Sequence, residues 1–168
     1  MFNVLFLCSG NSARSILAEA LINAPEIGHG KFRGYSAGSQ PAGSIHPLTL
    51  ETLRASGLST EGLRSQSWDD FGEPIDGAPE MDFVFTVCDT AAQEVCPIWP
   101  GSPVTAHWGV ADPARVTGSD DDRRRAFFET LHVLRRRIEL FTALPFHTLN
   151  RLALQQRVVE IGRDRAAV

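Results

Sequence analysis

The sequence predicts an α/β fold: a four-stranded parallel sheet flanked by helices on both faces, with an extra C-terminal helix. Four short apolar runs are typical of strands, and segments with helical spacing of apolar residues lie between and after them. Strands that alternate with helices form βαβ units, whose sheets are parallel and covered on both faces. The length of 168 residues suits one domain with a core of ordinary size, so we expect a single domain over residues 1–168.

The elements follow in order along the chain. The predicted strands are residues 3–8, 32–37, 83–87 and 104–107. The predicted helices are residues 12–24, 47–56, 120–144 and 149–161, with a short helical turn at 91–96. The pattern is clearest over 120–144, where apolar residues recur at spacings of three, four and seven and Pro145 then ends the helix. The last helix belongs to a C-terminal helical extension at about 146–162.

The composition of the chain argues against several classes of protein. The net charge of −4 argues against a nucleic-acid-binding protein, because such a domain carries a basic surface. No signal peptide is recognisable, and no apolar segment approaches the roughly 20 residues of a membrane span. We therefore expect a cytoplasmic protein, in which thiols stay reduced and three cysteines suit redox or catalytic chemistry better than a disulfide framework. The oligomeric state is left open.

The first predicted strand leads directly into a loop with the composition of an oxyanion site. The loop is Cys8-Ser9-Gly10-Asn11-Ser12-Ala13-Arg14-Ser15. A cysteine thiolate attacks the central atom of phosphate or arsenate once its pKa of about 8.5 is lowered, which loop N–H groups and a helix N-terminus favour. We expect Gly10 to allow the tight bend and Asn11 to adopt left-handed angles. Arg14 can hold two oxygens of the anion, and Ser15 can donate to the sulfur. A purely structural Cys8 would explain neither the bend nor its placement.

Three more residues extend this hypothesis. Cys88 follows the third predicted strand, so it should lie at the same carboxyl edge of the sheet as Cys8. Cys96 follows after a short segment. The alternatives are that both are small buried apolar residues, or that they bind zinc together with His107, although zinc ligand pairs normally lie closer in sequence. Asp112 precedes a proline that stiffens its loop, so this residue can supply a proton to a departing oxygen.

Three segments together resemble one enzyme family. They are the cysteine loop with Glu19-Ala20 behind it, Ser36-Ala37-Gly38, and Ala106-His107-Trp108-Gly109-Val110-Ala111-Asp112-Pro113-Ala114. On these residues, nearly the whole chain resembles the low-molecular-weight protein tyrosine phosphatases, and within them the arsenate reductases built on that fold. The resemblance implies a four-stranded parallel sheet, oxyanion binding by residues 9–15 and Asp112 as general acid. It also implies a possible potassium ion near Asn11 and Glu19, and no other metal.

The choice between phosphatase and reductase depends on other residues. Phosphotyrosine phosphatases of this fold carry aromatic residues directly after Asp-Pro, whereas this chain has Ala114 and Arg115. Arsenate reduction needs a second thiol that attacks the arsenylated cysteine. The resemblance implies a relay from Cys8 to Cys88 to Cys96, with no tightly bound cofactor. The electron donor would be an external thiol reductant, either thioredoxin or glutathione with glutaredoxin.

Two alternatives remain beside an arsenate reductase. One is a phosphatase that hydrolyses phosphotyrosine or small aryl phosphates through a cysteinyl-phosphate intermediate, and the other is a non-enzymatic oxyanion sensor. The chain also departs from its relatives in three ways. Ala13 stands where many carry a second cysteine, seven residues instead of six separate Cys88 from Cys96, and the C-terminal helix is additional. The spacing leaves the electron donor open.

Overall fold

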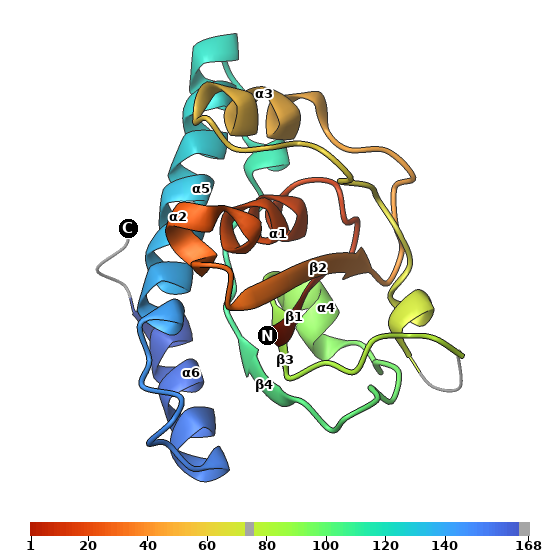
Figure 1. The fold of residues 1–168 in the computed structure, drawn as a ribbon. Coiled ribbons are helices and arrows are strands. Elements are labelled where there is room, and N and C mark those ends of the chain that lie inside the picture. The colour runs from red at the N-terminus through yellow and green to blue at the C-terminus, as the bar shows by residue number, and fades with distance from the viewer. Residues whose placement is uncertain (73–75, 165–168) are drawn as a thin grey trace.

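In a computed structural model of the chain, which describes residues 1–72 and 76–164, four parallel strands form one sheet in the order β2-β1-β3-β4 (Figure 1). The strands are β1 (Phe2–Cys8), β2 (Phe32–Gly38), β3 (Phe83–Thr86) and β4 (Val104–His107). The predicted four-stranded parallel sheet is therefore confirmed, with each strand end within one residue of its expected place. Residues 73–75, and residues 165–168 at the end of the predicted domain, lie outside the described residues.

Burial on both faces explains why β1 lies inside the sheet. Val4 and Phe6 are fully buried in one core cluster, and Leu5 and Leu7 are buried in a second cluster on the other face. Side chains alternate across a strand, so a strand that is apolar at every position requires a cover on both faces. This central strand brings Cys8 to the carboxyl edge between two neighbours.

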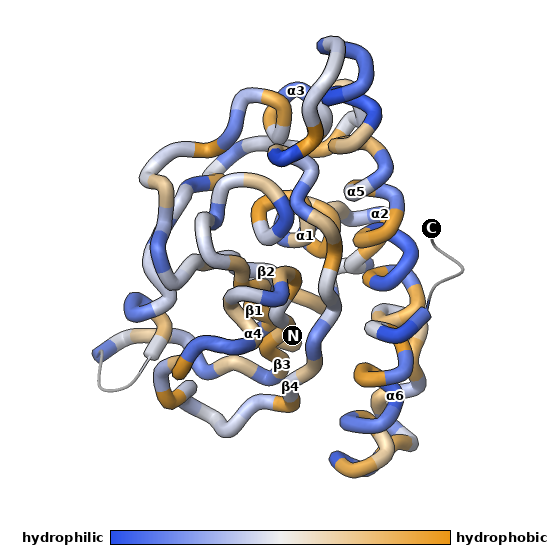
Figure 2. The backbone as a smooth tube through the Cα atoms, turned by 180° about the vertical axis from the view of Figure 1, so that it is seen from behind, coloured by the Kyte–Doolittle hydropathy of each residue, from blue (hydrophilic) through white to orange (hydrophobic). Residues whose placement is uncertain are grey.

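Besides the short helix that follows β3, five α-helices in the described part of the chain contribute to the larger cluster or surround it. They are α1 (Arg14–Asn23), α2 (Pro25–Gly28), α3 (Pro47–Ala55), α5 (Asp120–Thr142) and α6 (Arg151–Arg163). The long helix α5 runs along one side of the molecule past α3, α2 and α1 (Figure 1). In Figure 2 the strands form an apolar centre, while apolar and polar residues alternate along α5 and α6. The helices predicted from 3.6-residue periodicity are therefore present, with ends shifted by one or two residues.

The opposite face has a thinner cover. It consists of the short 3₁₀-helix η1 (Trp68–Phe71) and coil, whose buried Trp68, Phe71, Met81 and Trp99 pack against the strands. The sheet is therefore covered on both faces, as predicted. On this face, however, large side chains form the cover instead of a long helix.

The short helix after β3 is displaced from its predicted range. It is α4 (Asp89–Gln93) rather than residues 91–96, because Cys88 caps it: the Cys88 sulfur accepts a hydrogen bond from Ala91 N at 3.4 Å. Glu94 is extended and ends the helix. Neither α2 nor the 3₁₀-helix η2 (Pro113–Arg115) was expected. In the part of the chain that the structure describes, no helix is both long and apolar enough to cross a membrane.

Candidate active site

The predicted nucleophile lies at the junction of β1 and α1. Cys8 is the last residue of β1, and its side chain is only 3% exposed. Its sulfur is 2.9 Å from the Ser15 hydroxyl and accepts a hydrogen bond from Asn11 N at 3.2 Å. The loop therefore curls around the sulfur and ends in the first turn of α1, as the sequence predicted.

The bend depends on other residues than we expected. Asn11 has the left-handed φ of 44°, as predicted, whereas Gly10 does not, and a side-chain carbon at Gly10 would meet only Ser12 Oγ at 3.7 Å. The expected steric role of Gly10 is therefore wrong. Gly38, at the end of β2, has that role instead, because a Cβ there would lie 2.4 Å from Ser9 O and 3.0 Å from Asn11 Cβ.

A buried hydrogen-bond network orients the loop. The Asn11 side-chain amide donates to Ser15 Oγ at 2.8 Å and to Ser36 Oγ at 3.0 Å, while its oxygen accepts from Gln66 N at 2.7 Å. Because Ser15 accepts from Asn11, its own hydrogen is directed to the Cys8 sulfur. The Ser36 hydroxyl donates to Glu19. The resemblance also implies that Ser36 helps Asn11 and Glu19 to hold the loop, and these contacts agree with that role. The Gln66 contact had no signal in the sequence.

The residues near the implied potassium ion hydrogen-bond to one another. The Asn11 oxygen accepts from Gln66 N, the Asn11 nitrogen donates to Ser36, and the Ser36 hydroxyl donates to Glu19. These bonds connect the loop to α1 directly. The potassium ion stays an expectation from the resemblance, and the proposed chemistry does not use it.

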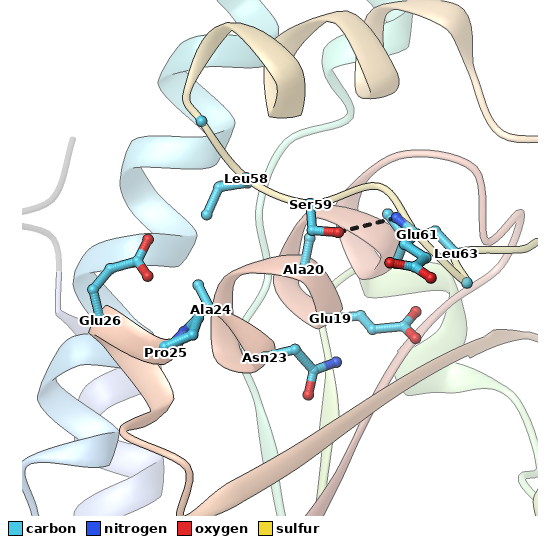
Figure 3. A pocket seen from close by; sticks show the side chains of 12 residues that line it. Glu19, Ala20, Asn23, Ala24, Pro25, Glu26, Leu58, Ser59, Glu61 and Leu63 are labelled. Atoms are coloured by element: carbon cyan, nitrogen blue, oxygen red, sulfur yellow. Dashed lines mark hydrogen bonds between the residues drawn. The ribbon is translucent and has the colours of Figure 1, made fainter.

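Besides its hydrogen bond with Ser36, Glu19 borders a cavity. It lines a cavity of about 400 Å³ between α1 and residues 57–63, together with Asn23, Glu26 and Glu61 (Figure 3). Burial raises the pKa of Glu19 from its ordinary 4.5 to about 7, although the hydrogen bond from Ser36 and the charge of Arg64 both lower it. The network under Cys8 therefore contains a carboxyl group that titrates near neutral pH.

The electrostatics of Cys8 differ from the expectation of a lowered pKa. Burial raises the pKa of the Cys8 thiol, and a negative charge on Cys88 would raise it further. The hydrogen bonds from Ser15 and the charge of Arg14 lower it, but less than burial raises it. Desolvation disfavours the thiolate, so in the protein alone burial outweighs the donors that the loop provides.

Arg14 and Asp112 lie close together, which agrees with the place of Asp112 over the cysteine loop that the resemblance implies. Arg14 Nη2 lies 3.6 Å from Asp112 Oδ2, and its other terminal nitrogen donates to Val110 O at 3.1 Å. Asp112 caps η2 by accepting from Ala114 N at 3.0 Å, and its side chain is 27% exposed. The guanidinium thus connects the cysteine loop to the segment that carries the candidate acid.

The second cysteine lies against the same loop. Ser9 N donates to the Cys88 sulfur at 3.3 Å, and Cys88 is 2% exposed. Neighbouring N–H groups of one loop, those of Ser9 and Asn11, therefore contact the sulfurs of Cys88 and Cys8. The expected position at the shared carboxyl edge is confirmed by this geometry.

Cys96 is separate from this pair. All three cysteines are free thiols, and Cys96 is exposed between Val95 and Pro97, beyond the end of α4. His107, the third residue of the zinc alternative, contacts Thr86 and Asp89 instead of either cysteine. Within residues 1–72 and 76–164, no group of three or more histidine, cysteine, aspartate or glutamate residues could hold a metal ion, which contradicts the zinc alternative.

Comparisons with known proteins give consistent results. The model of the family described as low molecular weight phosphotyrosine protein phosphatase matches residues 3–153. An arsenate reductase from Halalkalibacterium halodurans is 31% identical over 138 residues, which cover 82% of this chain and 93% of that protein.

Solved structures share the fold. A structure described as an arsenate reductase in the phosphate binding state has a TM-score of 0.67 at 24% identity, covering 85% of this chain and 98% of that one. A thioredoxin-dependent arsenate reductase from Corynebacterium glutamicum has a TM-score of 0.53 at 25% identity, covering 83% of this chain and 63% of that one.

Proposed function

The chain belongs to the low molecular weight phosphotyrosine protein phosphatase family, and from this premise we propose that it is an arsenate reductase. The observation that carries the proposal is that two buried thiols contact one loop: Ser9 N donates to the Cys88 sulfur and Asn11 N donates to the Cys8 sulfur. Phosphate-ester hydrolysis needs one thiol, whereas reduction needs a second thiol within reach of the first.

The first proposed step forms a bond between Cys8 and arsenic. The Cys8 thiolate attacks arsenic(V), while Arg14 and the loop N–H groups bind the remaining oxygens. Asp112 gives its proton to the departing oxygen, which leaves as water. The Ser15 hydroxyl, 2.9 Å from the sulfur, stabilises the thiolate against its burial. The product is an arsenylated cysteine with arsenic still in its pentavalent state.

The second step transfers two electrons. The Cys88 thiolate attacks the Cys8 sulfur, the sulfur–arsenic bond breaks, and its electron pair stays on arsenic, which leaves as arsenite. Cys8 and Cys88 are then joined in a disulfide, so the two thiols are oxidised as arsenic is reduced. The contact of the Cys88 sulfur with the backbone of Ser9, the residue next to Cys8, supports this attack.

The third step moves the disulfide to the surface. The Cys96 thiolate attacks Cys88, which forms a Cys88–Cys96 disulfide and releases Cys8 as a thiolate. An external thiol reductant, either thioredoxin or glutathione with glutaredoxin, then reduces this bond, and its own thiols are oxidised to a disulfide. The exposed Cys96 has Val95 and Ile98 beside it, which are 97% and 74% exposed, and such an apolar margin suits contact with a reductant protein.

The third step also requires α4 to change shape. A five-residue helix is about 7.5 Å long, and Glu94 and Val95 add further length between the two cysteines. Disulfides need Cα atoms within about 6.8 Å. We therefore expect the α4 segment to unwind or fold back before Cys88 and Cys96 join.

The phosphatase alternative is not favoured. The relative with 31% identity is named an arsenate reductase, and Ala114 and Arg115 offer no aromatic surface for a phosphotyrosine ring. Because Cys8, Arg14 and Asp112 also suit phosphate chemistry, we expect slow hydrolysis of an aryl phosphate in either case. That hydrolysis is a measure of the intact loop and does not distinguish the two functions.

Disulfide mapping tests the proposal. Reduced protein freed of small thiols is incubated with arsenate, quenched in acid, and digested for mass spectrometry. We expect an arsenate-dependent Cys8–Cys88 or Cys88–Cys96 bond, absent in Cys8→Ser. The Cys88→Ser variant should lose arsenate turnover and keep hydrolysis of p-nitrophenyl phosphate. If all three thiols stay free while wild-type protein hydrolyses the aryl phosphate, the protein is a phosphatase.

A further inference from the structure

A row of three polar side chains crosses the carboxyl ends of β3 and β4. His107 Nδ1 is 2.8 Å from Thr86 Oγ1, and His107 Nε2 is 2.8 Å from Asp89 Oδ1. An ionised carboxylate only accepts hydrogen bonds, so Nε2 carries a hydrogen and donates it to Asp89. In the neutral ring, Nδ1 then accepts from the Thr86 hydroxyl. The imidazole is therefore held at both nitrogens between a strand and α4.

Asp89 is the first residue of α4 and directly follows Cys88. Helices as short as α4 are not stable alone, so contacts with the rest of the protein must hold it. Within α4, all of whose residues the structure describes, only Ala91 is buried. In the described ranges 1–72 and 76–164, Asp89 is also the only α4 side chain that hydrogen-bonds to another element. The contact with His107 is thus a main attachment of this helix to the sheet.

The pair also packs against the segment that leads to Asp112. A Cβ at Gly109 would lie 2.7 Å from His107 Nε2 and 2.9 Å from Asp89 Oδ1. Glycine at this position leaves room for the two side chains to meet. The contact therefore joins β3, α4 and the start of the segment that carries the acid.

We propose that Asp89 and His107 are positioning residues for Cys88. Their contact holds the first turn of α4 in place and thereby keeps the Cys88 sulfur at Ser9 N, where it is 3.3 Å away. The contact must break before α4 can open and Cys88 can reach Cys96. The inference rests on the proposed relay, because it assigns these two residues control over the step from Cys88 to Cys96.

The reactivity of Cys88 provides a test that needs no arsenate. In reduced protein, the rate of Cys88 alkylation by iodoacetamide is measured by mass spectrometry, with Cys8 in the same sample as internal reference. The Asp89 side chain is 85% exposed, and contacts between such exposed partners are weak. We therefore expect His107→Ala to raise the Cys88 rate about two- to fivefold, with no change at Cys8.

A double-mutant cycle separates the contact from effects on the helix itself. Asp89→Ala, His107→Ala and the double variant should all show the same increase, because each removes one shared interaction. His107→Gln keeps a side-chain N–H donor and should restore part of the wild-type rate. The matched control is Thr90→Ala, which changes an exposed α4 residue that has no side-chain hydrogen bond in the described structure. An unchanged Cys88 rate in His107→Ala, or additive effects of the two single variants, would overturn the proposal.

The relay itself is tested with diamide, which takes two electrons and two protons from a pair of thiols. Formation of the Cys88–Cys96 disulfide should be faster in His107→Ala by the same factor as alkylation. Hydrolysis of p-nitrophenyl phosphate should stay at the wild-type rate. If hydrolysis changes in parallel with alkylation, the variant disturbs the Cys8 loop and the proposal fails. If wild-type protein shows no arsenate-dependent disulfide while the alkylation cycle behaves as expected, the proposed reductase fails and the positioning role stands.

Discussion

The Ser15 hydroxyl has one hydrogen, and the hydrogen bond that it accepts from Asn11 determines which group that hydrogen can bond. Asn11 donates to its oxygen at 2.8 Å, which leaves the Ser15 hydrogen for the Cys8 sulfur at 2.9 Å. Hydrogen bonds to charged groups contribute about 1.5–3 kcal/mol, and this one favours the thiolate where burial opposes it.

Ser15→Ala should therefore raise the pKa of Cys8 further. We expect the acid limb of the pH dependence of kcat/KM for p-nitrophenyl phosphate to move up by about one to two pH units. Ser39→Ala is the control, because the buried Ser39 hydroxyl has no hydrogen-bond partner among the described residues. An unmoved acid limb in Ser15→Ala would show that another group controls the thiolate.

Glu19 gives the stability of the protein a dependence on pH. Its pKa is raised from 4.5 to about 7, so the folded state binds a proton in this range that the unfolded state does not. Stability due to this residue is therefore full below pH 4.5, falls as the pH rises towards 7, and stays low above it. The upper limit of this change is about 3 kcal/mol.

Glu19→Gln removes the titration but keeps an oxygen that can accept from Ser36. We expect the variant to gain stability relative to wild type between pH 5 and pH 8, as measured by urea unfolding at both values. Glu61→Gln, the same change at another glutamate that lines the cavity, is the matched control. A constant difference between Glu19→Gln and wild type across this range would contradict the assigned pKa.

At the scale of elements, Trp108 connects the sheet to the C-terminal helix. Its ring is fully buried and stacks on Phe85 with centroids 3.9 Å apart, and its Nε1 donates to Val158 O at 2.8 Å. The additional helix α6 thereby becomes part of the core, through buried Val158 and Ile161. Helix α6 therefore packs as an integral part of the domain.

Trp108→Phe should lower the free energy of unfolding by about 1–3 kcal/mol, because it removes the hydrogen bond and leaves a void. Urea unfolding measures the loss, and Leu152→Ala, at a position 69% exposed on α6, is the control. Equal stability of Trp108→Phe and wild type would mean that α6 is held by other contacts alone.

At the scale of the whole molecule, an oxyanion should stabilise the fold, because the loop that binds it exists only when β1, β2 and α1 are assembled. A ligand at 100 times its Kd contributes about 2.7 kcal/mol to stability. We expect phosphate to raise Tm relative to chloride at equal ionic strength. Arg14→Lys keeps the charge but loses the planar pair of donors, so its Tm shift should be much smaller. An equal shift in the variant would place phosphate elsewhere.

The structural features that depend on residues close to one another in the chain could be predicted from the sequence. The strands, the periodic helices and the Cys8 loop are local patterns, and Cys88 could be placed because parallel strands end at one edge. The roles of Gly38 and Gln66 were missed because their contacts with the loop span about 30 and 55 residues. The raised pKa of Cys8 was missed because burial is a property of the assembled core.

The central place of β1 has a consequence for synthesis of the protein. Cys8 leaves the ribosome early, but β1 pairs with β3, whose first residue lies roughly 75 positions later in the chain. At translation rates of about 5–20 residues per second, that interval lasts on the order of 4–15 s. Until β3 arrives, one edge of β1 is unpaired and the core around the Cys8 thiol is incomplete. We therefore expect the thiol to be more accessible to oxidants in the growing chain than in the folded protein, where it is buried.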